Sequence, residues 1–114
     1  MLQSIRAGVE QNGIRSGVIL SGIGSLSRYH VHVVDRPELP TRDAFFGAEG
    51  PFDILSVTGL IIEGRVHAHI TLSNTERAVG GHLEEGCRVL TFAMVIIADT
   101  PDVVLRGWDQ VGTL

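Results

Sequence analysis

Lysine is absent from this chain of 114 residues, so all nine of its basic side chains other than histidine are arginines. Acidic residues number 13, and the formal net charge is −4. The arginines are scattered, without the basic run or stripe that a duplex-binding protein uses to displace counterions from phosphates. The sequence therefore counts against direct DNA binding, unless folding gathers arginines from separate segments.

Cysteine, aromatic residues and long apolar runs are scarce as well. The only cysteine, Cys87, excludes an intrachain disulfide and fits a reducing compartment. No apolar stretch reaches the roughly 20 residues that cross a membrane, and no signal-peptide pattern opens the chain. These absences predict a cytoplasmic protein.

What is present favours one compact domain over residues 1–114. Hydrophobic residues make up 44% of the chain, with 14 glycines, and this mix suits a turn-rich folded domain and argues against disorder. Charged residues make up only 19%, which leaves apolar surface that a monomer covers poorly. The low charge therefore indicates self-association.

The apolar spacing predicts one helix followed by a mostly antiparallel sheet, which is an α+β fold. Leu2, Ile5 and Val9 recur at helical spacing, and Gly13 is a natural end for a helix over residues 2–12. The strand at 88–98 is apolar on both faces, which indicates either a central strand or one covered by a partner. The predicted strands cover residues 17–24, 26–34, 52–63, 65–72 and 88–98, with an edge strand suggested at 102–106, a hairpin turn at 63–64, and loops at 35–51 and 73–81.

The pattern that carries chemistry is His67-Ala68-His69. Residues two apart on a strand point to the same face, so both imidazoles leave the apolar face and can converge on one ion. A third histidine, His82, follows the flexible pair Gly80-Gly81, which allows it to approach the same face. Three neutral imidazoles with an open fourth position are a zinc pattern, and imidazole also suits iron, nickel or copper. The alternative is that these are ordinary surface histidines.

Several other residues are candidates for a functional role, and some of them allow two interpretations. His30 and His32 form a second pair of this kind, which either joins the first site, if the strands are neighbours, or lines a subunit interface. Glu84 and Glu85 form either a solvated face or an outer partner or general base for the histidines. Cys87 is predicted to be a small core residue. The glycine-rich stretch 22–26 is predicted to be a tight turn between strands, and no serine has the partners of a catalytic triad.

The order of these motifs resembles the PPC ("plants and prokaryotes conserved") domain over roughly residues 2–98. The most specific part is the histidine strand 67–72 followed by Gly80-Gly81-His82-Leu83, and next comes the stretch Gly50-Pro51-Phe52-Asp53-Ile54-Leu55. The remaining parts of the resemblance are Ser21–Leu26 and Gly86–Val89.

The resemblance implies a mixed α/β fold around an antiparallel sheet, a homotrimer, and a cluster of His67, His69 and His82 on a metal. Plant members carry AT-hooks beside the domain, whereas prokaryotic members usually stand alone, and several are described as DNA-binding candidates. This chain contains no Arg-Gly-Arg-Pro core of an AT-hook. It also has Pro51 where plant members have a basic residue, Met94 where a glutamate is expected, and a helix where the family has a first strand.

These observations are consistent with three functions. The first is a trimeric metal-binding protein, with a divalent ion, zinc first, on His67, His69 and His82. The second is a trimeric regulatory or scaffolding module, in which the histidines are structural or sense pH. The third is DNA binding through a surface made by trimer symmetry. No substrate pocket is identifiable from the sequence, so no reaction is predicted.

Overall fold

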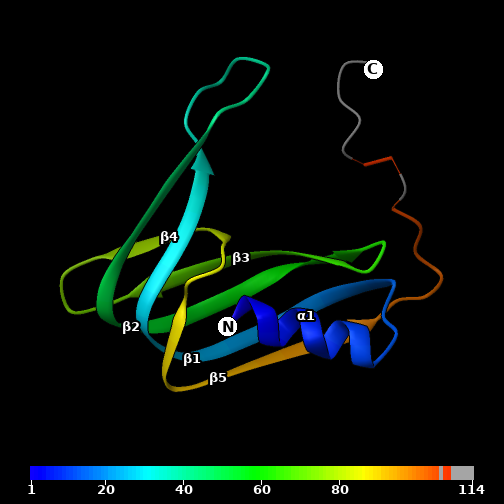
Figure 1. Ribbon diagram of the computed structural model, residues 1–114, viewed down its shortest axis with the longest axis horizontal. Helices are drawn as coiled ribbons and strands as arrows, with labels where there is room; N and C mark the ends of the chain where they lie inside the picture. The colour runs from blue at the N-terminus through cyan, green and yellow to red at the C-terminus, as the bar shows by residue number, and fades with distance from the viewer. Residues whose placement is uncertain (106, 109–114) are drawn as a thin grey trace.

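A computed structural model describes residues 1–105 and 107–108 of the chain (Figure 1). It contains one helix followed by five strands, which confirms the α+β prediction. The elements are α1 (Leu2–Gln11), β1 (Ser16–Val34), β2 (Asp43–Ile62), β3 (Arg65–Ser73), β4 (Ala78–Leu83) and β5 (Arg88–Asp99). Within the part of the chain that the structure covers, no helix is both long and apolar enough to cross a membrane.

All strand pairings are antiparallel, and they run from β1 through β2, β3 and β4 and back to β1. β1 pairs with three other strands. β2 lies along one of its edges, and β4 and β5 lie along different parts of the other edge. The pairs β1–β4 and β3–β4 place the end of β1 beside the short strand β4, which in turn lies beside β3 (Figure 1). This arrangement brings three separate segments of the chain together at β4.

The core lies inside this curved sheet. The helix contributes Leu2, Ile5 and Val9, as its spacing predicts. Phe52 on β2 is buried and meets Tyr29 of β1 edge to face, with ring centroids 4.9 Å apart. Apolar side chains from β3 fill the same interior, which leaves the alternate positions of that strand facing outward.

β1 is one continuous strand, so the prediction of two strands separated by a glycine turn is wrong. Gly22 and Gly24 lie within the strand, and Gly24 has a φ of +139°. A Cβ at Gly24 would collide with the carbonyl oxygen of Phe92 on β5. Gly24 therefore allows close approach of β5 at a shift in strand register, while Gly22 leaves room for the side chain of Val57 on β2. Sequence patterns do not separate such positions from a turn.

Two predicted loops are shorter than expected. The loop after β1 ends at Asp43, where β2 begins. Residues 43–49 pair with the far end of β1 and form the stem of a hairpin that projects at the top of Figure 1. The loop after β3 likewise ends at Ala78, since Ala78–Leu83 pairs with β3. The prolines and glycines in these stretches favour loops locally, but pairing with distant segments of the chain forms strands there.

The hairpin turn at Glu63-Gly64 is confirmed, with φ values of 51° and 80° that suit a tight turn between β2 and β3. Residues 102–105 form no strand, and residue 106 lies outside the described residues. The prediction of an edge strand there is therefore wrong over the part that the structure describes.

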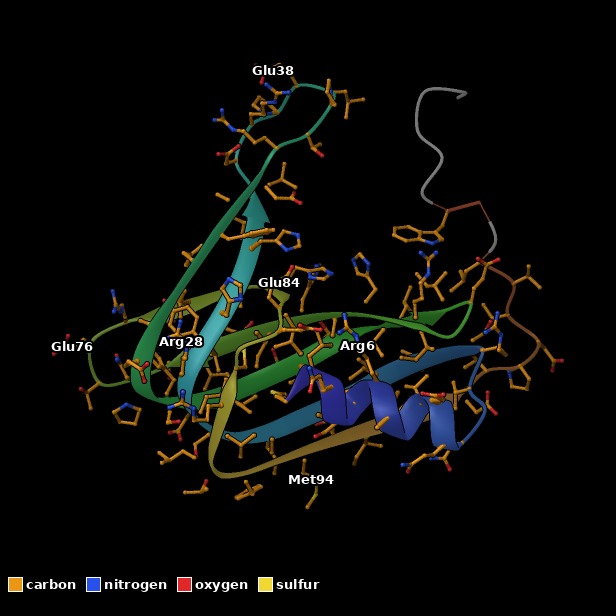
Figure 2. The ribbon with its side chains drawn as sticks, viewed as in Figure 1. Arg6, Arg28, Glu38, Glu76, Glu84 and Met94 are labelled. Carbon is orange, nitrogen blue, oxygen red and sulfur yellow. The ribbon has the colours of Figure 1, made fainter. Side chains whose placement is uncertain are left out.

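β5 lies at an edge of the sheet, so the central-strand reading of residues 88–98 is wrong. Its outward side chains are exposed, and Met94 points away from the sheet in Figure 2, with 57% of its surface exposed. Neighbouring positions on β1 and β2 add to an apolar outer surface, which we call the β5 face: Leu20, Ile23, Leu55, Leu90, Phe92, Met94 and Ile96. The other reading, a strand covered by a partner, stays a prediction.

Candidate metal centre

Three histidines stand in one row across three neighbouring strands. His69 on β3 is the direct partner of His82 on β4, and His82 is the direct partner of His32 on β1. The imidazole rings of His32 and His82 are stacked, with centroids 4.4 Å apart. The ring centroids of His69 and His82 are 5.6 Å apart. Antiparallel pairing alone therefore brings residues 50 positions apart in the sequence to one point.

A fourth histidine, His67, lies two residues before His69 on β3. Its ring centroid is 4.7 Å from that of His82 and 5.6 Å from that of His69. Ala68 and Ile70 between and beyond these histidines are buried, so the predicted division of β3 into an apolar face and a histidine face is confirmed. The structure thus brings together all three of the predicted residues.

The tightest set of metal-ligand atoms is a different one. Within the described part of the chain, one ligand atom each from His32, His82 and Glu84 lies within 4.8 Å of the others. The sequence had left the role of His32 open, and the β1–β4 pairing places it in the cluster. His82 belongs to both sets and therefore occupies the centre of the cluster.

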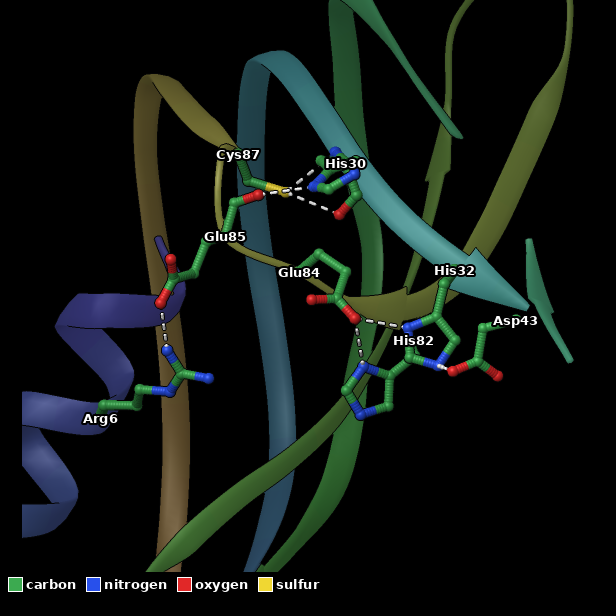
Figure 3. A network of polar contacts seen from close by, with 8 residues as sticks. All are labelled: Arg6, His30, His32, Asp43, His82, Glu84, Glu85 and Cys87. Atoms are coloured by element: carbon green, nitrogen blue, oxygen red, sulfur yellow. Dashed lines mark hydrogen bonds and ion pairs between the residues drawn. The ribbon is translucent and has the colours of Figure 1, made fainter. Parts of the chain in front are cut away.

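Glu84 connects two of the histidines (Figure 3). Its Oε1 lies 2.5 Å from Nδ1 of His32 and 3.5 Å from Nδ1 of His82. On the other side of the His32 ring, Nε2 is 3.8 Å from Oδ2 of Asp43. Nδ1 of His82 is buried and makes no hydrogen bond. A buried nitrogen without a hydrogen bond costs free energy that a bound ion or a proton relay can recover.

The cluster favours the neutral form of two of its imidazoles. Burial, and then the neighbouring rings of His69 and His32, lower the pKa of His67 below its ordinary value. Burial also lowers the pKa of His82, with contributions from His32, His67 and His69, while Glu84 acts in the opposite direction. Metal binding requires a neutral imidazole, so both shifts prepare the rings for an ion at neutral pH.

The histidines border an open hollow of about 470 Å³. Gly80 and Gly81 form part of its wall, and a Cβ at Gly81 would lie 2.7 Å from the carbonyl oxygen of His32. Gly81 therefore allows β4 to lie close against β1, and Gly80 allows it to lie close against β3, where an added Cβ would be 2.7 Å from the carbonyl oxygen of Ile70. The remaining lining is Val33, Val34, Ile70 and Thr71 beside the histidines.

Three further residues at the cluster escaped the sequence analysis. The ring of Phe45 meets that of His32 edge to face at 5.1 Å, and the ring of Trp108 meets that of His67 at 5.2 Å. Asp43 approaches His32 from the start of β2. All three lie in segments that looked like loop or tail, and no sequence signal indicated their proximity to the histidines.

The remaining candidates lie apart from the cluster. His30 bonds through Nδ1 to the carbonyl oxygen of Glu85 at 2.7 Å, and Glu85 pairs with Arg6 at 2.6 Å (Figure 3). Cys87 is buried, as predicted, and burial raises the pKa of its thiol. Ser25 is buried and bonds to the hydroxyl of Thr91 at 2.5 Å. This pair gives no sign of an activated nucleophile.

The same fold and motifs recur in known proteins. Residues 1–101 match the model of the Plants and Prokaryotes Conserved (PCC) domain. The chain belongs to this family. The PPC resemblance of the sequence is therefore confirmed for that span, and the prediction that residues 102–114 are part of the same domain stays a prediction.

Solved structures of similar proteins agree on the architecture. A hypothetical protein of Salmonella cholerae-suis is 26% identical, with a TM-score of 0.73 over 87% of this chain and 68% of its own. A plant- and prokaryote-conserved (PPC) protein of Pyrococcus horikoshii is 25% identical, with a TM-score of 0.67 over 84% and 67% of the two chains. A metal-containing protein of Archaeoglobus fulgidus is 22% identical, with a TM-score of 0.67 over 85% and 69%.

A curated relative is much longer than this PCC domain. The protein is a "Bifunctional protein GlmU" of Synechococcus sp. strain JA-2-3B'a(2-13), 30% identical over 101 residues. The match covers 88% of this chain but only 15% of that protein. A PCC-like segment therefore occurs as a small part of a larger polypeptide.

Proposed function

We propose that this PCC domain binds a divalent metal ion, zinc first, through His67, His69 and His82. The observation that carries the proposal is the convergence of these rings around His82, with centroids 4.7 and 5.6 Å away. Imidazole nitrogens suit zinc, and three of them leave a fourth position for water or a ligand. The fold neighbour from Archaeoglobus fulgidus, described as metal-containing, supports the same reading.

His32 and Glu84 complete the centre from the other side of His82. A carboxylate that bonds a histidine ring fixes its orientation and raises its basicity. Glu84 has this position toward His32, at 2.5 Å, and lies near His82 as well. His32 or Glu84 also offers a further ligand if the ion sits closer to β1. A bound ion would supply Lewis acidity at the open hollow, and the chain's own residues would orient the ligands and keep them neutral.

The domain further acts as a homotrimer in this proposal. The β5 face exposes seven large apolar side chains on one side of the sheet, and such a surface marks an interaction site in a protein with few charges. An assembly that covers this face also serves the alternative function, a scaffolding or regulatory module whose histidines are structural. The two functions differ in whether the cluster binds an ion.

DNA binding is the third candidate. It is supported only by the description of a similar structure: a fold neighbour from Ralstonia eutropha JMP134, 24% identical, is described as a DNA-binding candidate. The net charge of −4 opposes it, because contact with phosphates depends on a basic surface. A gel shift at low salt, where such contacts are strongest, would show a complex only if this ranking is mistaken.

Chelator competition measures the metal affinity directly. The metal-free wild type, the triple variant His67→Ala/His69→Ala/His82→Ala and the control His30→Ala are titrated with zinc. The control removes the one histidine that bonds to a backbone carbonyl outside the cluster. We expect the triple variant to lose zinc binding and the control to keep it. Equal binding by all three proteins would refute the proposal.

A further inference from the structure

A second hollow, of about 470 Å³, lies where the end of α1, the start of β1 and the turn between β2 and β3 meet. It shares no lining residue with the histidine hollow. Its most notable feature is that Arg6, Arg15 and Arg65 all line it, together with a single acidic residue, Glu10. One third of the arginines of an acidic, lysine-free chain therefore border one concave surface.

The turn that follows β2 holds one of these arginines in place. The backbone N–H of Gly64 donates to the carbonyl oxygen of Arg15 at 2.9 Å. A Cβ built at Gly64 would lie 2.6 Å from Nη1 of Arg15, so the guanidinium lies over the bare glycine. The left-handed φ of +80° at Gly64 also favours glycine there. Arg15 and Gly64 therefore lie against each other in the lining of the hollow.

The three arginines differ in their partners. Arg6 pairs with Glu85 through Nη1 at 2.6 Å, which fixes its direction. In the same structure Arg28 pairs with Glu49 and Arg42 with Asp35. No ion pair or hydrogen bond of either guanidinium occurs for Arg15 and Arg65 within the residues that the structure describes. Both residues line the hollow, and no protein acceptor within the described residues occupies their guanidinium donors.

The chemistry of the lining defines the class of ligand. A guanidinium presents paired N–H donors that match the oxygens of a phosphate, so two unpaired forks suit a dianion better than a single carboxylate. Val9, Ile14 and Val66 add an apolar wall, on which the organic part of a ligand can rest. Glu10 can accept a hydrogen bond from a hydroxyl of that part and disfavours a bare anion.

We propose that this hollow binds a small organic phosphate, with Arg15 and Arg65 as the main phosphate contacts and Arg6 beside them. The site is independent of the metal centre, since neither its residues nor its chemistry involve the histidines.

The test is an NMR titration of the metal-free full chain with glycerol 3-phosphate in a buffer without chloride or sulfate. Removal of the metal prevents phosphate from binding at the histidines. We expect saturable shifts of the amide signals of Gly13, Gly64 and Arg65. Absence of saturable shifts at these amides, or saturation confined to the histidine cluster, would overturn the proposal.

Matched variants separate a fitted site from general charge. Arg15→Gln/Arg65→Gln should weaken binding by roughly tenfold or more, because hydrogen bonds to charged groups are the strong ones. Arg15→Lys/Arg65→Lys keeps the charge but loses the fork, and should still weaken it. Glu10→Gln should strengthen it. Arg77→Gln removes one charge from the loop before β4 and should leave the affinity for glycerol 3-phosphate unchanged. Equal weakening by Arg77→Gln would contradict a phosphate site. Tighter binding of malonate than of glycerol 3-phosphate would also contradict it.

Discussion

His69 and His82 face each other as direct partners of the β3–β4 ladder, and their ring centroids are 5.6 Å apart. The register of these two strands therefore brings two of the proposed metal ligands together. A shift of β4 by one residue would turn His82 to the other face of the sheet. The close packing at Gly80 and Gly81 fixes this register, because a side chain at either position would meet the backbone of a neighbouring strand.

The roles of His32 and Glu84 can be separated from those of the three predicted ligands. If they act from the outer shell, His32→Ala and Glu84→Gln should each reduce zinc affinity by about 10–100-fold while the stoichiometry of binding stays the same. Chelator competition gives the affinity, and a direct titration gives the stoichiometry. Complete loss of binding in Glu84→Gln, with binding kept in His69→Ala, would instead place the ion on His32, His82 and Glu84.

The β5 face predicts self-association. Light scattering should give a mass three times the 12.3 kDa of the chain. Met94→Glu should yield a monomer that is still folded, because its side chain is 57% exposed in the single chain and contributes little to that fold. A monomeric wild type would remove the trimer from the account. Exposed Thr71→Glu, on the histidine face of β3, is the control and should keep the assembly.

Two glycines should respond to alanine in opposite directions. Gly24→Ala should destabilise the domain by roughly 1–3 kcal/mol or more, because of its φ of +139° and the collision with the Phe92 carbonyl. Gly8→Ala should stabilise it by roughly 0.5–1 kcal/mol, since Gly8 lies inside α1 and its Cβ would meet nothing within 4 Å. Thermal unfolding of the two variants measures both effects. An unchanged stability of Gly24→Ala would contradict the close contact between Gly24 and β5.

Burial raises the pKa of Cys87, with a hydrogen bond from the His30 backbone acting in the opposite direction. The folded protein therefore retains the thiol proton at a pH where the unfolded chain loses it. The free energy of unfolding should fall as the pH rises above 9.0, the ordinary value, and Cys87→Ala should lack this part of the pH dependence. Native Cys87 should also react slowly with iodoacetamide at pH 8; rapid labelling of the folded protein would contradict its burial.

The sequence predicted the elements whose signals are local. The helix ends near Gly13 as its spacing and its glycine indicate, and the β2–β3 turn falls at Glu63-Gly64. The division of β3 into two faces followed from the period of a strand. Local signals failed where pairing partners lie far away in the sequence. Residues 43–49 pair with β1, and residues 78–81 pair with β3, and these pairings place both stretches in strands.

The same limit applies to the candidate site. His67 and His69 share a face by periodicity, but the approach of His32 depends on the β1–β4 pairing, which no local pattern encodes. Asp43 and Phe45 reach the cluster because a hairpin folds back over β1, and the sequence there looked like loop. The sequence motif therefore accounts for His67 and His69 beside His82, whereas long-range pairing accounts for His32.

The central claim is that His67, His69 and His82 bind a metal ion, and elemental analysis by mass spectrometry tests it most directly. Untagged wild type, His30→Ala and His67→Ala/His69→Ala/His82→Ala are purified in parallel without chelator. The account predicts about one divalent metal ion, zinc first, per chain in the first two proteins and none in the third. Absence of metal in all three, or equal metal content in all three, would contradict it.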